Sequence, residues 1–117
     1  MLRVVICVWI ALLTALSLAP FAVKAELGTM GALHDIGHLS VFAATAVLLC
    51  WTATRLPQKL VRYLAVGALA LTLEWLEAAV YHNPFEWRDV LIDVLGAAIG
   101  LAIQSFVPLI SSRLADQ

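Results

Sequence analysis

The chain has 117 residues, of which 63% are hydrophobic and only 13% are charged, and its formal net charge is −1. A water-soluble domain of this length needs more charged surface, because its surface area is large relative to its volume. The composition therefore indicates an integral membrane protein with one domain covering residues 1–117. The slightly negative charge argues against a nucleic-acid-binding protein, which needs a basic face.

Four apolar runs approach the length of about 20 residues that a spanning helix needs. They cover about residues 4–20, 35–54, 63–82 and 89–110. Pro20 closes the first run, and Arg55 follows the second. The connections after the second and third runs are too short to hold another domain. The sequence predicts an all-α fold, an integral membrane bundle of four transmembrane helices.

The first apolar run has a second interpretation. Arg3, the apolar stretch and the small residues ending at Ala25 also fit a secretory signal cleaved before Glu26. Cleavage would leave three helices and remove a packing partner. We therefore favour an uncleaved first helix and keep cleavage as the alternative.

Basic residues predict the orientation of the bundle. With four spans, the two termini and the middle connection share one side of the membrane. That side carries Arg3, Arg55, Lys59, Arg62 and Arg113, and the other side carries Lys24 and Arg88. The positive-inside rule then predicts that both termini are cytoplasmic.

On this topology the acidic residues gather in the outer half of the bundle. The predicted site residues there are Asp35, His38, Glu74, Glu77, Arg88, Asp89 and Asp93. Spacings of three or four residues place the pairs Asp35 and His38, Glu74 and Glu77, and Asp89 and Asp93 each on one helix face. Carboxylates at membrane depth cost a few kcal/mol unless they are partnered. A shared polar pocket near the outer face is therefore predicted, and protonation, a bound cation or a basic ligand group would offset its excess negative charge.

Glycines mark the predicted packing faces. Gly96 and Gly100 form a GxxxG motif on the fourth helix, and Gly67 lies on the third helix. Such motifs allow helices to approach closely. The same motif permits a homo-oligomer, so both interpretations stay open.

Three short motifs follow one another along the chain: Asp35-Ile36-Gly37-His38-Leu39, then Glu74-Trp75-Leu76-Glu77, then Arg88-Asp89 followed by Asp93 and Gly96 through Gly100. In this order they resemble the VanZ-like family. VanZ-like proteins are small bacterial membrane proteins named for a member that lowers susceptibility to the antibiotic teicoplanin. The resemblance implies a multi-pass protein of the bacterial cytoplasmic membrane with a role in the cell envelope. Glu77 and Asp93 stand where the family usually has Gln and Asn, which makes this pocket more acidic.

Three classes of function follow from these residues. The first is a protein whose outer pocket binds an amphiphilic envelope ligand, such as a lipid-linked precursor or an antibiotic, or that modulates the cell envelope and its susceptibility to glycopeptide antibiotics. The second is a membrane hydrolase of a lipid-linked phosphate or ester, in which His38, Glu74, Glu77 and Asp93 hold a divalent cation. The third is a proton or ion pathway. Whether the protein is an enzyme stays open, because the chain lacks the common hydrolase motifs.

Overall fold

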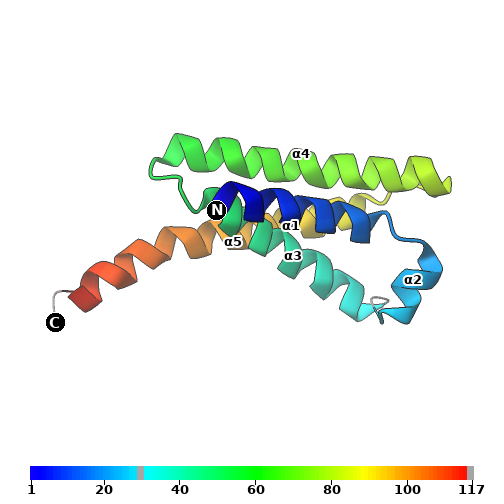
Figure 1. Cartoon of the computed structure of the whole chain (residues 1–117), viewed down its shortest axis with the longest axis horizontal. Helices are drawn as coiled ribbons and strands as arrows, with labels where there is room; N and C mark the ends of the chain where they lie inside the picture. The colour runs from blue at the N-terminus through cyan, green and yellow to red at the C-terminus, as the bar shows by residue number, and fades with distance from the viewer. Residues whose placement is uncertain (29–30, 116–117) are drawn as a thin grey trace.

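The computed structural model describes residues 1–28 and 31–115, with side chains described as far as residue 106. Five helices follow in chain order (Figure 1): α1 (Leu2–Ser17), α2 (Phe21–Glu26), α3 (Ala32–Cys50), α4 (Leu56–Tyr81) and α5 (Trp87–Ala115). The described residues contain no β-strand, which confirms the all-α prediction.

Three helices are long and apolar enough to cross a membrane: Ala32–Cys50, Leu56–Tyr81 and Trp87–Phe106. They correspond to the second, third and fourth predicted spans. The remaining long helix, α1, has 16 residues, which at 1.5 Å per residue gives about 24 Å. That is shorter than the roughly 30 Å hydrocarbon core of a bilayer. The short helix α2 was not predicted.

Local sequence accounts for the helix ends. Pro57 lies in the first turn of α4, where its missing N–H costs no hydrogen bond. His82 follows α4 in the left-handed conformation, with φ of 54°, which is a common way to end a helix. Gly28 and Gly31 flank the α2–α3 connection with φ of 69° and 68°, a region that glycine enters without strain.

The long helices alternate in direction along the chain (Figure 1). α1 and α4 run one way, and α3 and α5 run the other way. One end of the bundle therefore holds α2, the start of α3, the end of α4 and the start of α5. We call it the α2 end. The N-terminus and the α3–α4 connection lie at the opposite end.

The parallel helices α3 and α5 pack in register through glycine. A Cβ added at Gly96 would lie 3.0 Å from Leu39 Cα, and one added at Gly100 would lie 2.9 Å from Ala46 Cβ. One turn further along α5, Gln104 Nε2 donates a hydrogen bond to the Val47 carbonyl at 3.3 Å. Successive turns of α5 thus meet successive turns of α3 at very close range.

Gly67, the third glycine predicted to mark a packing face, lies in a looser contact. A Cβ added there would lie 4.0 Å from Val94 Cγ2, which is an ordinary van der Waals distance. The α4–α5 interface therefore does not need glycine at this position.

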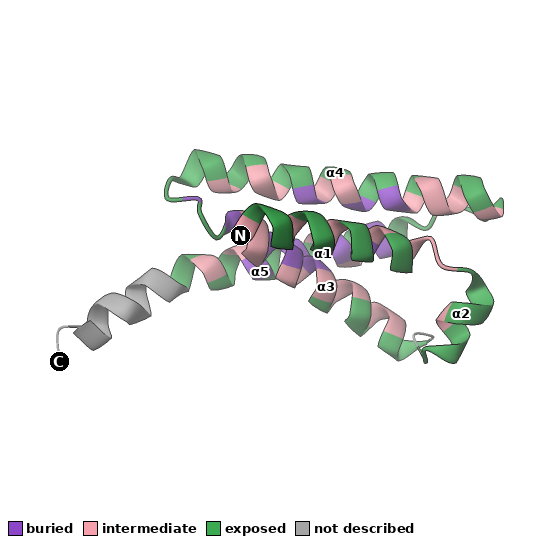
Figure 2. Cartoon of the chain, viewed as in Figure 1, coloured by how far each residue is buried: buried purple, intermediate pink, exposed green. Residues whose placement is uncertain are grey.

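Large apolar side chains cover the outside of the bundle. The exposed residues are the green parts of the ribbon in Figure 2. Leu64 on α4 is 68% exposed and Leu91 on α5 is 67% exposed. The main cluster of buried apolar side chains is small: Leu13, Phe42, Ala46, Val66, Ala70, Leu73 and Ala97. Contiguous apolar surface on this scale is unfavourable in water and suits contact with hydrocarbon.

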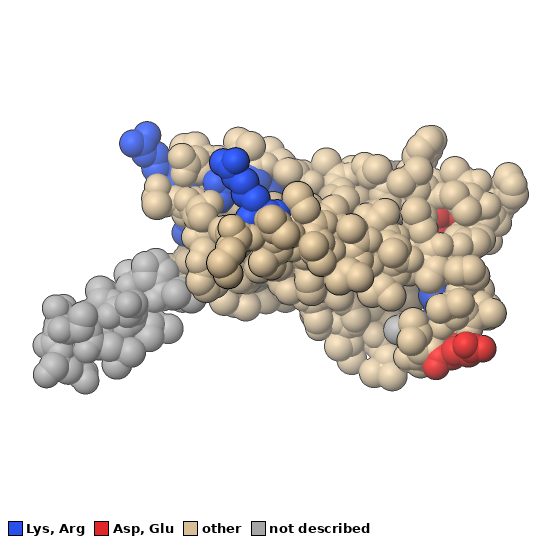
Figure 3. Space-filling view, in the orientation of Figure 1, with Lys and Arg blue, Asp and Glu red and all other residues tan. Residues whose placement is uncertain are grey.

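Charged side chains gather at the two ends of the bundle. On the face drawn in Figure 3, most Lys and Arg side chains lie near the N-terminus and the visible acidic ones lie at the α2 end. The surface between them is free of charge in that view. On that face, this distribution leaves an uncharged band between the two ends of the bundle.

Candidate functional site

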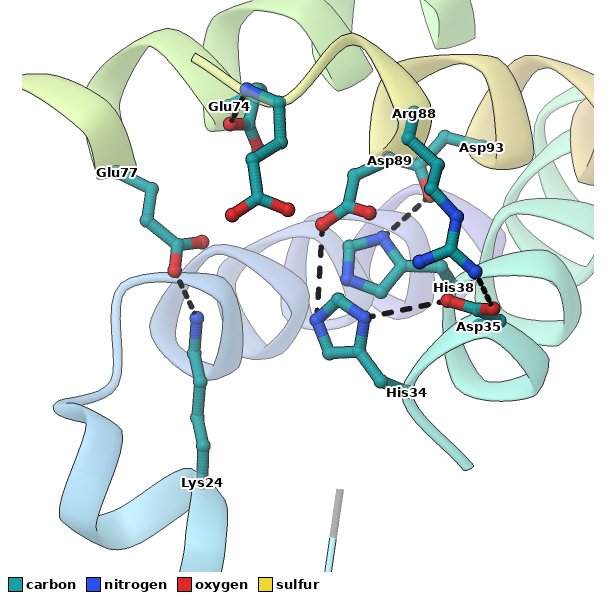
Figure 4. Close-up of polar contacts among 10 residues, drawn as sticks. Lys24, His34, Asp35, His38, Glu74, Glu77, Arg88, Asp89 and Asp93 are labelled. Atoms are coloured by element: carbon teal, nitrogen blue, oxygen red, sulfur yellow. Dashed lines mark hydrogen bonds and ion pairs between the residues drawn. The ribbon is translucent and has the colours of Figure 1, made fainter. Parts of the chain in front are cut away.

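Two His–Asp pairs connect α3 and α5 at the α2 end (Figure 4). His38 Nδ1 lies 2.8 Å from Asp93 Oδ1, which is hydrogen-bond distance. One turn nearer the end of the bundle, His34 Nε2 lies 3.8 Å from Asp89 Oδ2. The imidazole rings are neighbours, with centroids 4.4 Å apart. The two pairs follow from the parallel register, because residues four apart on one helix face residues four apart on the other.

The two aspartates are the most buried charged groups of the site. The side chains of Asp89 and Asp93 are 9% and 5% exposed. Asp93 has a hydrogen-bond partner in His38. Asp89 makes no side-chain hydrogen bond to any residue whose side chain the structure describes, and His34 is its nearest ion-pair partner. No fully buried side-chain oxygen of the described residues lacks a hydrogen-bond partner, so the carboxylate oxygens of Asp89 keep contact with solvent and are open to a further group.

Two basic side chains complete ion pairs at the edges of the site. Arg88 pairs with Asp35 next to the α5 start. Lys24 Nζ on α2 lies 2.5 Å from Glu77 Oε1 on α4. The second pair connects α2 to α4. Lys24 is therefore a second cation of the site, in addition to Arg88, which is the one cation among the predicted site residues.

Glu74 holds the α4–α5 connection. Its Oε1 accepts a hydrogen bond from the backbone N–H of Glu86 at 2.7 Å. This contact fixes the chain just before α5 begins. Glu74 therefore supports the position of Asp89 indirectly.

The predicted site residues all lie at the α2 end, but their partners differ from the predicted metal set. Glu74 and Glu77 are engaged with the Glu86 backbone and with Lys24. Among the described side chains, the group whose donor atoms lie within 4.8 Å of one another is His34, His38 and Asp89. His34 belongs to this group but is not among the site residues that the sequence predicts. The signal for it was its spacing of four residues from His38 on one helix face.

An apolar pocket of about 350 Å³ lies beside this cluster. Trp9, Leu13 and Leu16 of α1 line one wall, and Val41 and Phe42 of α3 line another. Ser17, Lys24, His34 and His38 supply its polar lining. The volume lies in the range of small-molecule sites, and apolar walls with a few polar groups are their usual composition.

Two hydrogen bonds hold α1 in place as a wall of the pocket. Trp9 Nε1 donates to Thr45 Oγ1 on α3 at 2.8 Å. Tyr81 Oη at the end of α4 donates to the Leu18 carbonyl at 2.6 Å. Leu13 is the one buried side chain of α1, so these bonds add to a limited apolar contact.

No protein-family model, curated protein or solved structure matches the chain. The function is therefore inferred from the side chains at the α2 end and the pocket beside them.

Proposed function

We propose that the chain is a multi-pass protein of the bacterial cytoplasmic membrane that binds an amphiphilic ligand of the cell envelope. The observation that carries this proposal is the pocket between α1 and α3, which joins an apolar wall to Lys24, His34 and His38. An acyl or prenyl chain fits the apolar part. A polar head group would then meet the basic and imidazole groups.

The membrane location is supported by the three helices of spanning length and by their apolar outer faces. In our proposal α1 completes a four-helix transmembrane bundle. Arg55, Lys59 and Arg62 lie at or near the start of α4, at the end of the bundle opposite the site. The positive-inside rule assigns that end to the cytoplasm and the α2 end to the extracytoplasmic face.

We retain membership of the VanZ-like family as part of this proposal. Asp35, His38, Glu74, Arg88 and Asp89, which carry the resemblance, all lie at the α2 end. A role in cell-envelope physiology, including susceptibility to glycopeptide antibiotics, follows from the resemblance. An extracytoplasmic amphiphile site is compatible with that role.

Translocation of protons or ions is less well supported than binding. On the side of Asp93 that faces away from the α2 end, α3 and α5 pack tightly against each other at Gly96 and Gly100. Phe42 and Ala46 fill the same level of the core, with exposures of 2% and 0%. Close apolar packing at this level leaves little room for a hydrated path.

The test uses Trp9 as a reporter of the pocket. The other tryptophans, Trp51, Trp75 and Trp87, are more than 60% exposed, so we expect them to tolerate replacement by Phe. The full-length triple variant in detergent is titrated with dibromostearate, an amphiphile whose bromine atoms quench nearby indoles. We expect saturable quenching of Trp9, because the brominated chain would enter the pocket that Trp9 lines.

Gly37 offers a way to fill the pocket. It lines the pocket, and a Cβ added there meets nothing within 4 Å. Gly37→Leu is expected to weaken the saturable quenching at least tenfold, whereas Ala68→Leu on an exposed position of α4 leaves it unchanged. Quenching that never saturates, or that Gly37→Leu does not alter, would contradict amphiphile binding in this pocket.

A further inference from the structure

We propose that His34, His38 and Asp89 bind one divalent transition-metal ion, with Asp93 and Asp35 orienting the two imidazoles. The three side chains offer donor atoms that all lie within 4.8 Å of one another. They come from two helices that are locked in register by the contacts at Gly96 and Gly100. The site is therefore built on rigid elements rather than on a loop.

Each imidazole has a carboxylate beside its Nδ1 atom. His38 Nδ1 donates to Asp93 at 2.8 Å, which leaves Nε2 with its lone pair available. His34 Nδ1 lies 3.8 Å from Asp35 Oδ1, and its Nε2 faces Asp89. Metal-binding histidines usually have a carboxylate or carbonyl at the other ring nitrogen, which fixes the ring orientation.

The distances are close to those that a metal ion requires. A tetrahedral ion with ligand bonds of about 2.0–2.1 Å needs donor atoms about 3.4 Å apart. His34 Nε2 and Asp89 Oδ2 are 3.8 Å apart, and all three donors lie within 4.8 Å. Side-chain rotations that shorten the distances between the donor atoms by roughly 1 Å would complete the coordination.

The negative net charge of the site favours the binding of a divalent cation. Asp35, Asp89 and Asp93 contribute three negative charges, Glu74 and Glu86 beside them contribute two more, and Arg88 contributes one positive charge. With both imidazoles neutral the site is strongly negative, and a divalent ion would offset two of the excess charges. The neighbouring pair of Lys24 and Glu77 is neutral by itself.

Asp89 gives a separate reason to expect a ligand. Its side chain is 9% exposed, and it makes no hydrogen bond within the described part of the chain. Its oxygens keep contact with solvent, because no fully buried side-chain oxygen of the described residues lacks a hydrogen-bond partner, so they are open to an incoming cation. A carboxylate near membrane depth is stabilised by a close cationic partner. Direct coordination of a cation would supply that partner.

The donor set identifies the kind of metal. Two imidazoles and one carboxylate suit Zn²⁺ or Mn²⁺, whereas Mg²⁺ and Ca²⁺ prefer ligand sets made only of oxygen. Because His34 and His38 also line the pocket, the ion would lie at the pocket wall. Its open coordination position would then meet a phosphate or carboxylate head group, a consequence that rests on the proposed function.

The test is titration of the purified full-length protein with Zn²⁺ by calorimetry in detergent, after treatment with a chelator. We expect one Zn²⁺ per chain and no measurable binding of Mg²⁺. His34→Gln and Asp89→Asn are expected to weaken Zn²⁺ binding at least about 100-fold, and Asp93→Asn about 10- to 100-fold. His82→Asn is the matched control, since His82 is exposed and asparagine tolerates its left-handed conformation.

Zinc K-edge absorption spectroscopy of the loaded wild-type protein gives a readout that depends on no variant. Two imidazoles in the first coordination sphere are expected. Absence of Zn²⁺ binding, equal weakening by His82→Asn, or a spectrum without imidazole would overturn the proposed metal site. Saturable quenching of Trp9 by dibromostearate in chelator-treated protein tests the amphiphile pocket separately, so either proposal can fail while the other stands.

Discussion

Replacing Gly100 with alanine is expected to lower the free energy of unfolding by about 1–3 kcal/mol. The added methyl group would lie 2.9 Å from Ala46 Cβ and 3.0 Å from the carbonyl carbon of Ala43. These neighbours belong to the facing helix, so the steric clash is relieved only if α3 and α5 move apart. Reversible unfolding in mixed detergent micelles, followed by circular dichroism, measures the change.

Gly67→Ala is the matched control for this prediction. A methyl group at Gly67 reaches only 4.0 Å from Val94 Cγ2, so it meets no obstacle. Alanine also favours the helix over glycine by roughly 0.5–1 kcal/mol. The free energy of unfolding is therefore expected to fall in Gly100→Ala and to rise in Gly67→Ala. Equal stabilisation by both variants would contradict the close packing of α3 on α5.

Replacing Asp93 alone with leucine is expected to destabilise the chain by about 1.5–3 kcal/mol, the range for a hydrogen bond to a charged group. The variant would leave the Nδ1 atom of His38 without its partner, now 2.8 Å away. His38 is 26% exposed, so water offsets part of the loss. The lower half of the range is therefore expected in detergent unfolding.

The double variant His38→Leu and Asp93→Leu is expected to recover most of this stability. Removing both partners leaves no unpaired polar group, and apolar replacements of buried pairs are often neutral or stabilising. The coupling in a double-mutant cycle should therefore be large. Simple additivity of the two single variants would show that the His38–Asp93 contact contributes nothing to stability.

The fold was predictable because its dominant signals are local. Runs of apolar residues identified the helices that became α3, α4 and α5, and the predicted boundaries differ from the observed ones by one to seven residues. Helix ends depend on caps such as Gly31 and His82, and α4 begins at Leu56, ahead of its apolar run, with Pro57 in its first turn. Helix α2 was missed, since its six residues carry no periodic apolar pattern long enough to detect. The first predicted span ends early at Ser17 because Pro20 follows so closely.

The site was predictable in its location but less so in its pairings. Spacing within each helix and the alternation of helix direction brought Asp35, Asp89 and Asp93 to one end of the bundle. The partners depend on the rotation of each helix about its axis, which short motifs do not determine. Lys24 is the clearest case, because its contact with Glu77 exists only through the path of α2.

The central proposal is that the polar cluster lies near the extracytoplasmic face. The most direct test is the accessibility of two introduced cysteines to a reagent that cannot cross the membrane. In a background without Cys7 and Cys50, cysteine is placed at Asn83 beside the cluster or at Gln58 near the opposite end, both exposed and uncharged. A membrane-impermeant maleimide applied to spheroplasts should label the Asn83 position at once and the Gln58 position only after permeabilisation. Labelling of the Gln58 position alone in sealed cells would place the cluster in the cytoplasm and contradict the account.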